Sequence, residues 1–336
     1  MKKIEEFLTP TQRELFRKLT MMYKNATIRK GSYILVPGQA PVMLVAHLDT
    51  VHHQPVKTIC RSDNGNILMS PQGIGGDDRC GVYALVTAHE RAAVKPWLLF
   101  TCDEEVGGVG ASAFCTEYGK GKMPKGLGDL KAIIEIDRKG RDDAVYYDCA
   151  NTDFESYITN KGFKTQFGSF SDISVVAPTL GVAAVNLSSG YYNAHTQHEY
   201  INQKHLNTTI RKVVGIIADS VKPNFPKYEY IESVRFTRFG SRGSYSWGWE
   251  DWAYERSGKI VRLDGGEQEY EGLSDIPADI RPAYELLLDY GYYSMAELED
   301  IRAAQGDQAI TMLAESEFGD DYYDLIYGDA DTEDMR

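Results

Sequence analysis

A glycine-rich stretch with two adjacent carboxylates constrains the fold of this chain more than any other part of the sequence. It spans Gly73 to Gly81 and reads GIGGDDRCG. Val82, Leu85 and Val86 follow at helical spacing, so the stretch predicts a turn that leads into a helix. Two interpretations of Asp77 are open from these residues. Aspartate is favoured at helix starts, where it caps the first turn, but a carboxylate on such a turn can also bridge two metal ions.

Further acidic and histidine residues follow apolar runs that predict buried strands. The expected strands and the polar residues after them are Val42–Ala46 with His47, Trp97–Cys102 with Glu104 and Glu105, Lys131–Ile136 with Asp137, and Val182–Leu187 with His195. His195 lies beyond a Gly-Tyr-Tyr turn, and the others directly follow their strands. In open α/β sheets the crevice outside such strand ends binds ligands. We therefore expect these side chains to meet near Asp77.

The alternation of strands and helices predicts an α/β fold, a three-layer α/β/α sandwich with a mixed, largely parallel sheet and a C-terminal extension. Thr9 and Pro10 indicate the N-cap and first position of a helix that extends to about Lys24. Asp63-Asn64-Gly65 predicts a tight turn between two short strands. Ser171-Asp172 predicts the cap of a short apolar helix.

Composition divides the chain into three predicted parts. Residues 1–222 form the α/β domain, residues 223–275 are rich in glycine, serine and aromatics, and residues 276–336 form a small acidic helical extension with a mobile tail. From residue 226 onward there are 26 acidic and 10 basic residues, whereas the whole chain has a net charge of −13. This acidity argues against nucleic-acid binding by the C-terminal third. A helix is expected from about residue 307 to 318.

Sequence features also bear on the compartment. The five cysteines form no C-x-x-C pair, which fits free thiols in a reducing environment. The N-terminus lacks the apolar core of a secretory signal, and no run approaches the roughly 18 apolar residues that a membrane span needs. We therefore expect a cytoplasmic protein without a membrane partner. The sequence leaves the oligomeric state open.

The candidate ligands carry only nitrogen and oxygen donors, which suits divalent cations. Zinc is the usual ion for histidine with carboxylate, and Mn²⁺ or Co²⁺ also fit. The spacing of His47 and Asp49 places both side chains on one face of a strand, so Asp49 can orient a ligating His47 or make an ordinary hydrogen bond. Each other candidate has an ordinary alternative: a solvated helix start for Glu104 and Glu105, a strand cap for Asp137, and an exposed loop residue for His195.

Five motifs in a fixed order decide between these alternatives. They are HLDTV from residue 47, GIGGDDRCG from residue 73, DEEVG from residue 103, ID at residues 136–137 and NAHTQHE from residue 193. Together they closely resemble the dinuclear zinc exopeptidases, the superfamily that includes peptidase T, bacterial zinc aminopeptidases and glutamate carboxypeptidases. The resemblance spans roughly residues 30–220 and implies the same α/β fold.

The resemblance also implies a role for each matching residue. Asp77 would bridge two Zn²⁺ ions through its two oxygens, and the peptide bond after it would be cis. His47 and Asp137 would bind one ion, and Glu105 and His195 the other. Glu104 would be the general base for a water activated between the ions. Asp49 would orient His47.

Two further features refine the predicted reaction. In the superfamily the strand-end acid tends to be Asp in aminopeptidases and Glu in carboxypeptidases, so Asp137 favours aminopeptidase action on short peptides. Only 58 positions separate Asp137 from His195, too few for the inserted lid domain of peptidase T. Without that domain, the Trp-rich segment at residues 246–253 covers the cleft or belongs to a core.

Two other functions stay open from the sequence. The same metal pair could serve an amidase or deacylase, because it hydrolyses any accessible amide. A non-catalytic metal-binding protein could use its acidic C-terminal region to recruit a partner. The presence of Glu104 argues against the second alternative, since binding alone needs no general base.

Overall fold

The computed structural model describes residues 2–52, 54–166, 168, 170–232, 252–254, 260–262, 273–289, 293 and 295–318. Contacts divide the chain into two compact units, residues 1–233 and 234–336. The first unit extends past residue 222, because Phe225 and Tyr228 are buried in its core. The predicted division at residue 275 stays a prediction. Of the Trp-rich segment, residues 246–251 lie outside the described residues.

The described part of the first unit contains an eight-stranded mixed sheet. In spatial order its strands are β1 (Thr27–Arg29), β2 (Tyr33–Val36), β6 (Trp97–Thr101), β3 (Val42–His47), β7 (Ala132–Arg138), β10 (Ala184–Ser188), β8 (Asp143–Val145) and β9 (Lys164–Thr165). The four central strands β6, β3, β7 and β10 run parallel to one another. The outer strands β2 and β8 run antiparallel to their central neighbours. The predicted mixed, largely parallel sheet is confirmed.

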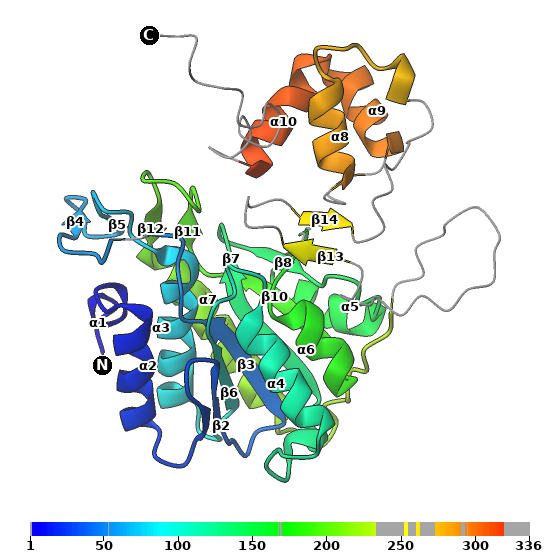
Figure 1. Cartoon of the computed structure of the whole chain (residues 1–336). Coiled ribbons are helices and arrows are strands. Elements are labelled where there is room, and N and C mark those ends of the chain that lie inside the picture. Colours follow the sequence, from blue (N-terminus) through cyan, green and yellow to red (C-terminus); the bar gives the residue numbers. More distant parts are fainter. Residues whose placement is uncertain are drawn as a thin grey trace. The chain divides into compact units, whose positions relative to one another are not determined.

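Helices cover both faces of this sheet, which completes the predicted three-layer sandwich (Figure 1). One core joins the sheet to α1 (Glu5–Leu8), α2 (Gln12–Met22), α3 (Gly76–Arg91), α5 (Thr152–Asn160) and α7 (Gln203–Ser220). The other joins it to α4 (Val109–Gly119), the 3₁₀ turn η1 (Leu127–Asp129) and α6 (Ile173–Leu180). Strand β3 serves both cores in alternation: Val42 and Leu44 lie in the first, Met43 and Val45 in the second.

Of the two predicted helix caps, the one at Thr9 is wrong and the one at Asp172 is at the predicted position. Helix α2 begins at Gln12, and its N-cap is Thr11 rather than Thr9. The Thr11 hydroxyl accepts a hydrogen bond from Glu14 N, and the Glu14 carboxylate accepts one from Thr11 N at 2.9 Å, so this pair forms a capping box. The Thr9 hydroxyl instead donates to Glu5 O in the preceding helix. Helix α6 has Asp172 at its N-cap position, but the Asp172 carboxylate accepts a hydrogen bond from Thr101 and makes none to the first turn of the helix.

A second, four-stranded sheet lies beside the main one. Its strands in order are β11 (Tyr191–Tyr192), β12 (Tyr200–Asn202), β5 (Ile67–Met69) and β4 (Cys60–Arg61). Strands β4 and β5 form the predicted hairpin around residues 63–65. Because β12 pairs with β5, this sheet holds the loop of His195 against the segment that leads into α3.

The described residues of the second unit form a small strand pair and a helical cluster. These elements are β13 (Trp252–Tyr254), β14 (Ile260–Arg262), the 3₁₀ turn η3 (Leu273–Asp275), α8 (Arg281–Asp289), α9 (Met295–Gln305) and α10 (Gln308–Phe318). The helices share a core that includes Tyr284, Leu287, Leu298 and Ile310. The helix predicted at residues 307–318 is confirmed.

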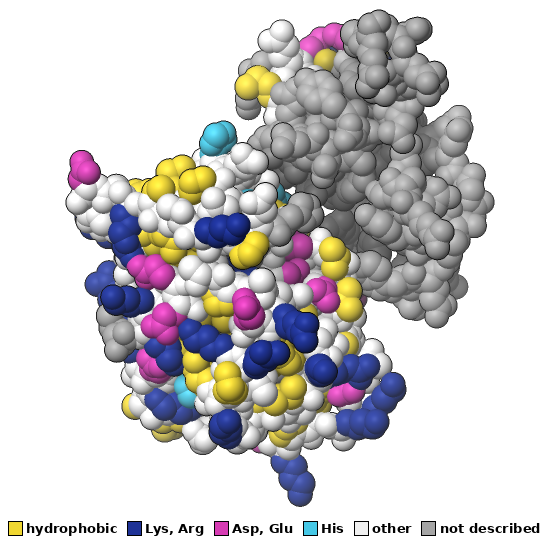
Figure 2. All heavy atoms as spheres, turned by 60° about the vertical axis from the view of Figure 1, so that its left-hand side comes forward, with side chains coloured by type: hydrophobic (Ala, Val, Ile, Leu, Met, Phe, Trp, Pro, Cys, Tyr) yellow, Lys and Arg dark blue, Asp and Glu magenta, His cyan; other side chains and the backbone are white. Residues whose placement is uncertain are grey.

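The structure also bears on the cysteines, on membrane spans and on the distribution of surface charge. All five cysteines lie in the described residues and are free. None of the helices in the described part of the chain is both long and apolar enough to cross a membrane. On the face of the first unit shown in Figure 2, basic and acidic side chains are interspersed.

Candidate metal centre

Parallel strands bring the predicted ligands to one edge of the main sheet. His47 is the last residue of β3 and pairs in register with Thr101, the last residue of β6. Glu104 and Glu105 follow the end of β6 after two intervening residues, and Asp137 lies near the end of β7, on the other side of β3. The order β6-β3-β7 therefore places His47 between the two acidic segments.

The turn at Asp77 supplies the centre of this arrangement. Asp77 (φ −80°, ψ 107°) and Asp78 (φ −113°, ψ 38°) have non-helical backbone angles at the start of α3. The peptide bond between them is cis, as predicted. In the first regular turn of α3, Gly81 N donates its hydrogen bond to the Asp78 carboxylate at 2.9 Å and not to Asp77, so Asp77 is not an ordinary N-cap. Its carboxylate faces two histidines instead.

One oxygen of Asp77 belongs to a first set of donors. Asp77 Oδ1 lies 3.2 Å from His47 Nε2, and Asp137 Oδ1 lies 3.6 Å from the same nitrogen. The three donor atoms lie close enough together to hold one ion. The His47 side chain is buried, with 1% of its surface exposed. We refer to His47, Asp77 and Asp137 as the inner set.

The other oxygen of Asp77 belongs to a second set. Asp77 Oδ2 lies 3.3 Å from His195 Nε2, and Glu105 Oε2 lies 3.2 Å from that nitrogen. These three donors could also hold one ion. The His195 side chain is 56% exposed, so this set faces solvent. We refer to Asp77, Glu105 and His195 as the outer set.

Asp49 and Glu104 lie beside the two sets. Asp49 Oδ1 is 3.3 Å from His47 Nδ1, and its other oxygen accepts a hydrogen bond from Glu105 N at 3.0 Å. Asp49 thus fixes the ring of one candidate ligand and the backbone of another. Glu104 Oε2 lies 3.9 Å from His47 Nε2, and His47, Glu104 and Glu105 form a third group of donors close enough together to hold an ion. The structure brings all seven predicted residues together, while their roles as ligands, base and orienting residue stay predictions.

Asp49→Ala is expected to weaken metal binding by about 10- to 100-fold, because His47 loses the partner of its Nδ1 and Glu105 loses its backbone anchor. Competition with a chromophoric chelator measures this change. Asp63→Ala, in the exposed hairpin turn of the second sheet, is the matched control and should bind with unchanged affinity. Equal affinity in Asp49→Ala and wild type would contradict the orienting role.

In the metal-free centre, the pKa values of the histidine and aspartate side chains are strongly shifted. Burial alone would lower the pKa of His47, but the carboxylates of Asp137, Asp49 and Asp77 raise it well above its usual value. Asp77 and then Glu105 raise the pKa of His195 to about 11. Burial would raise the pKa of Asp77, yet the two histidine rings hold it well below its usual range. Metal-free, the imidazoles therefore act as the cations of the centre.

The pKa values of Asp137 and Glu104 are shifted upward, in contrast to that of Asp77. Burial, followed by repulsion from Asp77, raises the pKa of Asp137 to about 8. Burial also raises the pKa of Glu104 well above its usual value, with further contributions from Asp137, Asp172 and Glu105. These shifts show that the carboxylates outnumber the positive charges available to them.

This donor set fits two divalent cations. Each set offers one imidazole and two carboxylates, the donors that zinc prefers when no thiolate is present. Within the described residues, Glu105 Oε1 is buried and has no hydrogen-bond partner. A buried carboxylate oxygen is costly without a partner, and a cation in the outer set would supply one.

No role was predicted from the sequence for several polar residues around the centre. Asp78 accepts hydrogen bonds from His47 N at 3.2 Å and Gly81 N at 2.9 Å, and so ties the turn to β3. Glu135 lies fully buried two positions before Asp137 and bonds to Ser171. The period of two along a strand puts Glu135 and Asp137 on one face, so this spacing could have indicated Glu135.

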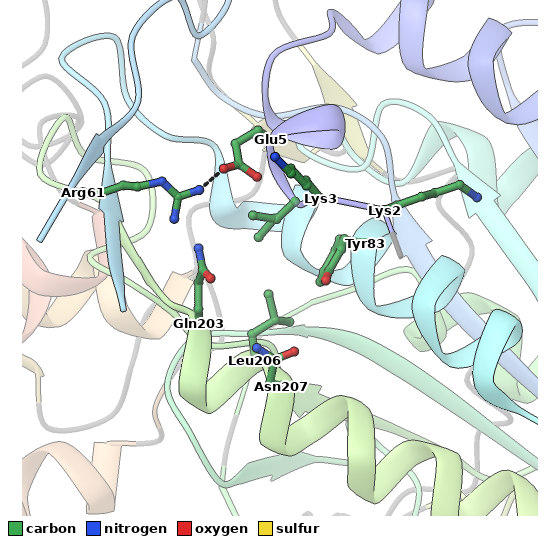
Figure 3. A pocket seen from close by; sticks show the side chains of 9 residues that line it. Lys2, Lys3, Glu5, Arg61, Tyr83, Gln203, Leu206 and Asn207 are labelled. Atoms are coloured by element: carbon green, nitrogen blue, oxygen red, sulfur yellow. Dashed lines mark ion pairs between the residues drawn. The ribbon is translucent and has the colours of Figure 1, made fainter. Parts of the chain in front are cut away.

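A separate cavity of about 310 Å³ lies elsewhere in the first unit. Figure 3 shows side chains that line it, including the Arg61–Glu5 ion pair. Its lining includes Lys2, Lys3, Glu5, Arg61, Tyr83 and Gln203. It shares no residue with the inner or outer set, so the candidate centre is not part of this cavity.

Neither a family model nor a curated protein sequence matches the chain. Similar solved structures include the aminopeptidase PepT from Bacillus cereus, at 15% identity and TM-score 0.49, with 65% of this chain and 98% of that chain covered. A tripeptidase from Staphylococcus aureus has 13% identity and TM-score 0.48, with 65% and 96% covered. The TET1 peptidase of Pyrococcus horikoshii has 14% identity and TM-score 0.45, with 64% and 99% covered. These proteins are peptidases, as are those that the five sequence motifs resemble.

Proposed function

We propose that this protein is a dinuclear zinc peptidase that removes N-terminal residues from short peptides. One observation carries the proposal: the two oxygens of Asp77 face two separate sets of histidine and carboxylate donors. A carboxylate shared in this way is the arrangement that a pair of neighbouring ions needs. A single structural ion would occupy only one set and would not account for the donors gathered in the other.

The inner and outer sets would each hold one ion. When bound, two zinc ions polarise a substrate carbonyl and acidify a water molecule. Asp77, Asp137 and Glu105 would offset the positive charge, and Asp49 would keep His47 in the orientation that presents Nε2. The half-exposed His195 lies where a peptide could approach from solvent.

Glu104 would carry the proton during hydrolysis. Its carboxylate lies beside both sets without belonging to either His47–Asp77–Asp137 or Asp77–Glu105–His195. Burial raises its pKa, which strengthens it as a proton acceptor. It would take a proton from the attacking water and return it to the leaving amine.

The direction of cleavage rests on Asp137, the residue type that the resemblance associates with aminopeptidases. Short peptides with a free or an acetylated N-terminus, incubated with the zinc-loaded chain, test this point. We expect release of the N-terminal residue from free peptides and none from blocked ones. Cleavage of only the blocked peptides would favour the amidase or deacylase alternative, and cleavage of neither would contradict a hydrolytic role.

Zinc binding at pH 7 is expected to release protons, and the affinity should rise between pH 6 and 8. In the metal-free protein the pKa of His195 is raised to about 11 and that of Asp137 to about 8. Both groups therefore carry protons at neutral pH, and ligation requires their loss. Calorimetric titration in two buffers of different ionisation enthalpy measures the release. A binding enthalpy independent of the buffer would contradict this account.

We also propose a cytoplasmic location for this protein and a peptide as its partner. Five free cysteines suit a reducing environment such as the cytoplasm. The expected partner is a peptide substrate.

A further inference from the structure

A buried carboxylate outside the two sets joins three segments of the centre. Glu199 is fully buried and lies at the end of the loop that carries His195. Its Oε1 accepts a hydrogen bond from Asp77 N at 2.9 Å, and its Oε2 accepts one from Gly75 N at 2.9 Å. His52 Nε2 lies 2.9 Å from the same Oε2. One side chain thus links the segment after β3, the Asp77 turn and the His195 loop.

The turn at Asp77 depends on such contacts, because helical hydrogen bonds do not hold it. Asp77 and Asp78 are both non-helical, and the bond from Arg79 N to Gly75 O is long, at 3.4 Å. Asp78 secures the turn on the side of β3 through His47 N. Glu199 secures it on the side of the His195 loop. These two carboxylates together fix the direction in which the Asp77 side chain leaves the backbone.

The glycines of the GIGG sequence leave room for this arrangement. A Cβ on Gly73 would come within 2.2 Å of the His52 ring, and one on Gly76 would come within 3.0 Å of Glu199 Oε1 and 2.7 Å of Tyr191 Cβ. A larger residue at Gly73 would displace the His52 ring, and one at Gly76 would clash first with Tyr191 and lie tightly against Glu199. These two glycines therefore allow His52, Tyr191 and Glu199 to approach the turn closely.

We propose that Glu199 is a positioning residue that aims the two oxygens of Asp77 at the inner and outer sets, with His52 holding Glu199 in place. The inference rests on the proposed metal centre. Glu199 touches neither set through its ligand atoms and acts on the backbone of Asp77. Its removal should therefore weaken both ions together, while all five candidate ligands remain in the chain.

Zinc affinity of the full-length, metal-free chain tests this proposal by competition with a chromophoric chelator. Glu199→Ala should weaken binding about tenfold or more, as loss of a group that orients ligands commonly does. Glu199→Gln should lose less, because its amide oxygen can still accept one of the two N–H bonds. His52→Ala should lose least, since the carboxylate keeps both N–H partners. Such graded recovery is not expected from a general loss of stability.

Leu19→Ala is the matched control for stability. Leu19 is fully buried in α2, so its truncation lowers the thermal stability without touching the turn, and we expect wild-type zinc affinity. Equal affinity in Glu199→Ala and wild type, or equal losses in Glu199→Ala and Leu19→Ala, would overturn the proposal.

The proposal can still be tested if Glu199→Ala does not fold, and its failure can be told apart from failure of the proposed function. If Glu199→Ala does not fold, unchanged zinc affinity in both Glu199→Gln and His52→Ala would overturn the positioning role. If the wild-type chain binds no zinc, the proposed function fails and this inference fails with it. Zinc binding by the wild type with no loss in the variants removes only the role of Glu199.

Discussion

Replacement of Glu104 by glutamine is expected to reduce peptide hydrolysis by about 10²- to 10⁴-fold, the usual contribution of a general base. The amide has nearly the same shape as the carboxylate but cannot accept the proton of the attacking water. Zinc content should not change if the inner and outer sets hold the ions, because neither set contains an atom of Glu104; a third possible group, His47–Glu104–Glu105, is the alternative that the zinc content tests. Turnover of a free peptide, measured beside the zinc content of the same sample, checks both statements.

Glu117→Gln is a matched control for Glu104→Gln. Glu117 lies in α4 and interacts with Tyr33 and Arg29, away from the centre. We expect this variant to hydrolyse peptides at the wild-type rate. Undiminished activity in Glu104→Gln would remove Glu104 as the base. A parallel loss of zinc would show that Glu104 is a ligand instead.

Replacement of Asp77 by alanine is expected to remove both ions, whereas His195→Ala should remove only the outer one. The two oxygens of Asp77 lie 3.2 Å from His47 and 3.3 Å from His195. One substitution therefore deletes a ligand from each set. Zinc per chain, determined by elemental analysis after removal of weakly bound metal, should fall from two to one in His195→Ala and to near zero in Asp77→Ala.

Asp129→Ala provides the control for these stoichiometries. Asp129 lies exposed in η1, so its loss should leave two ions in place. A single tightly held ion in both Asp77→Ala and His195→Ala would show that Asp77 serves only the outer set. The shared carboxylate would then be wrong, even if the protein were a metalloenzyme.

The sequence predicted the sheet well because its strands are continuous apolar runs with few competing interpretations. Residues 42–46 and 97–101 are continuous apolar runs, which are typical of buried parallel strands, and both form fully buried strands. Helix starts were less accurate. Thr9 and Thr11 are both suitable caps, and the choice depended on the reciprocal bonds between Thr11 and Glu14. Asp172 is the N-cap residue of α6, yet its carboxylate bonds to Thr101, 71 positions away, and not to the first turn of the helix.

The residues of the centre that could be predicted are those whose role follows from a motif in the sequence. His47, Asp77 and Glu105 stand in motifs whose order could be read from the sequence. Glu199 also stands in a motif, but its partners Asp77 N and Gly75 N are 122 and 124 positions away. Nothing local indicated that this glutamate would be buried. Contacts of this range depend on the pairing of β5 with β12, which the sequence did not reveal.

The central claim is that two ions lie on either side of Asp77. Anomalous X-ray scattering at the zinc absorption edge, from crystals of the zinc-loaded chain, tests it most directly. We predict two peaks about 3.5–4 Å apart, one among His47, Asp77 and Asp137 and the other among Asp77, Glu105 and His195. A single peak, or peaks that contact neither oxygen of Asp77, would contradict the account.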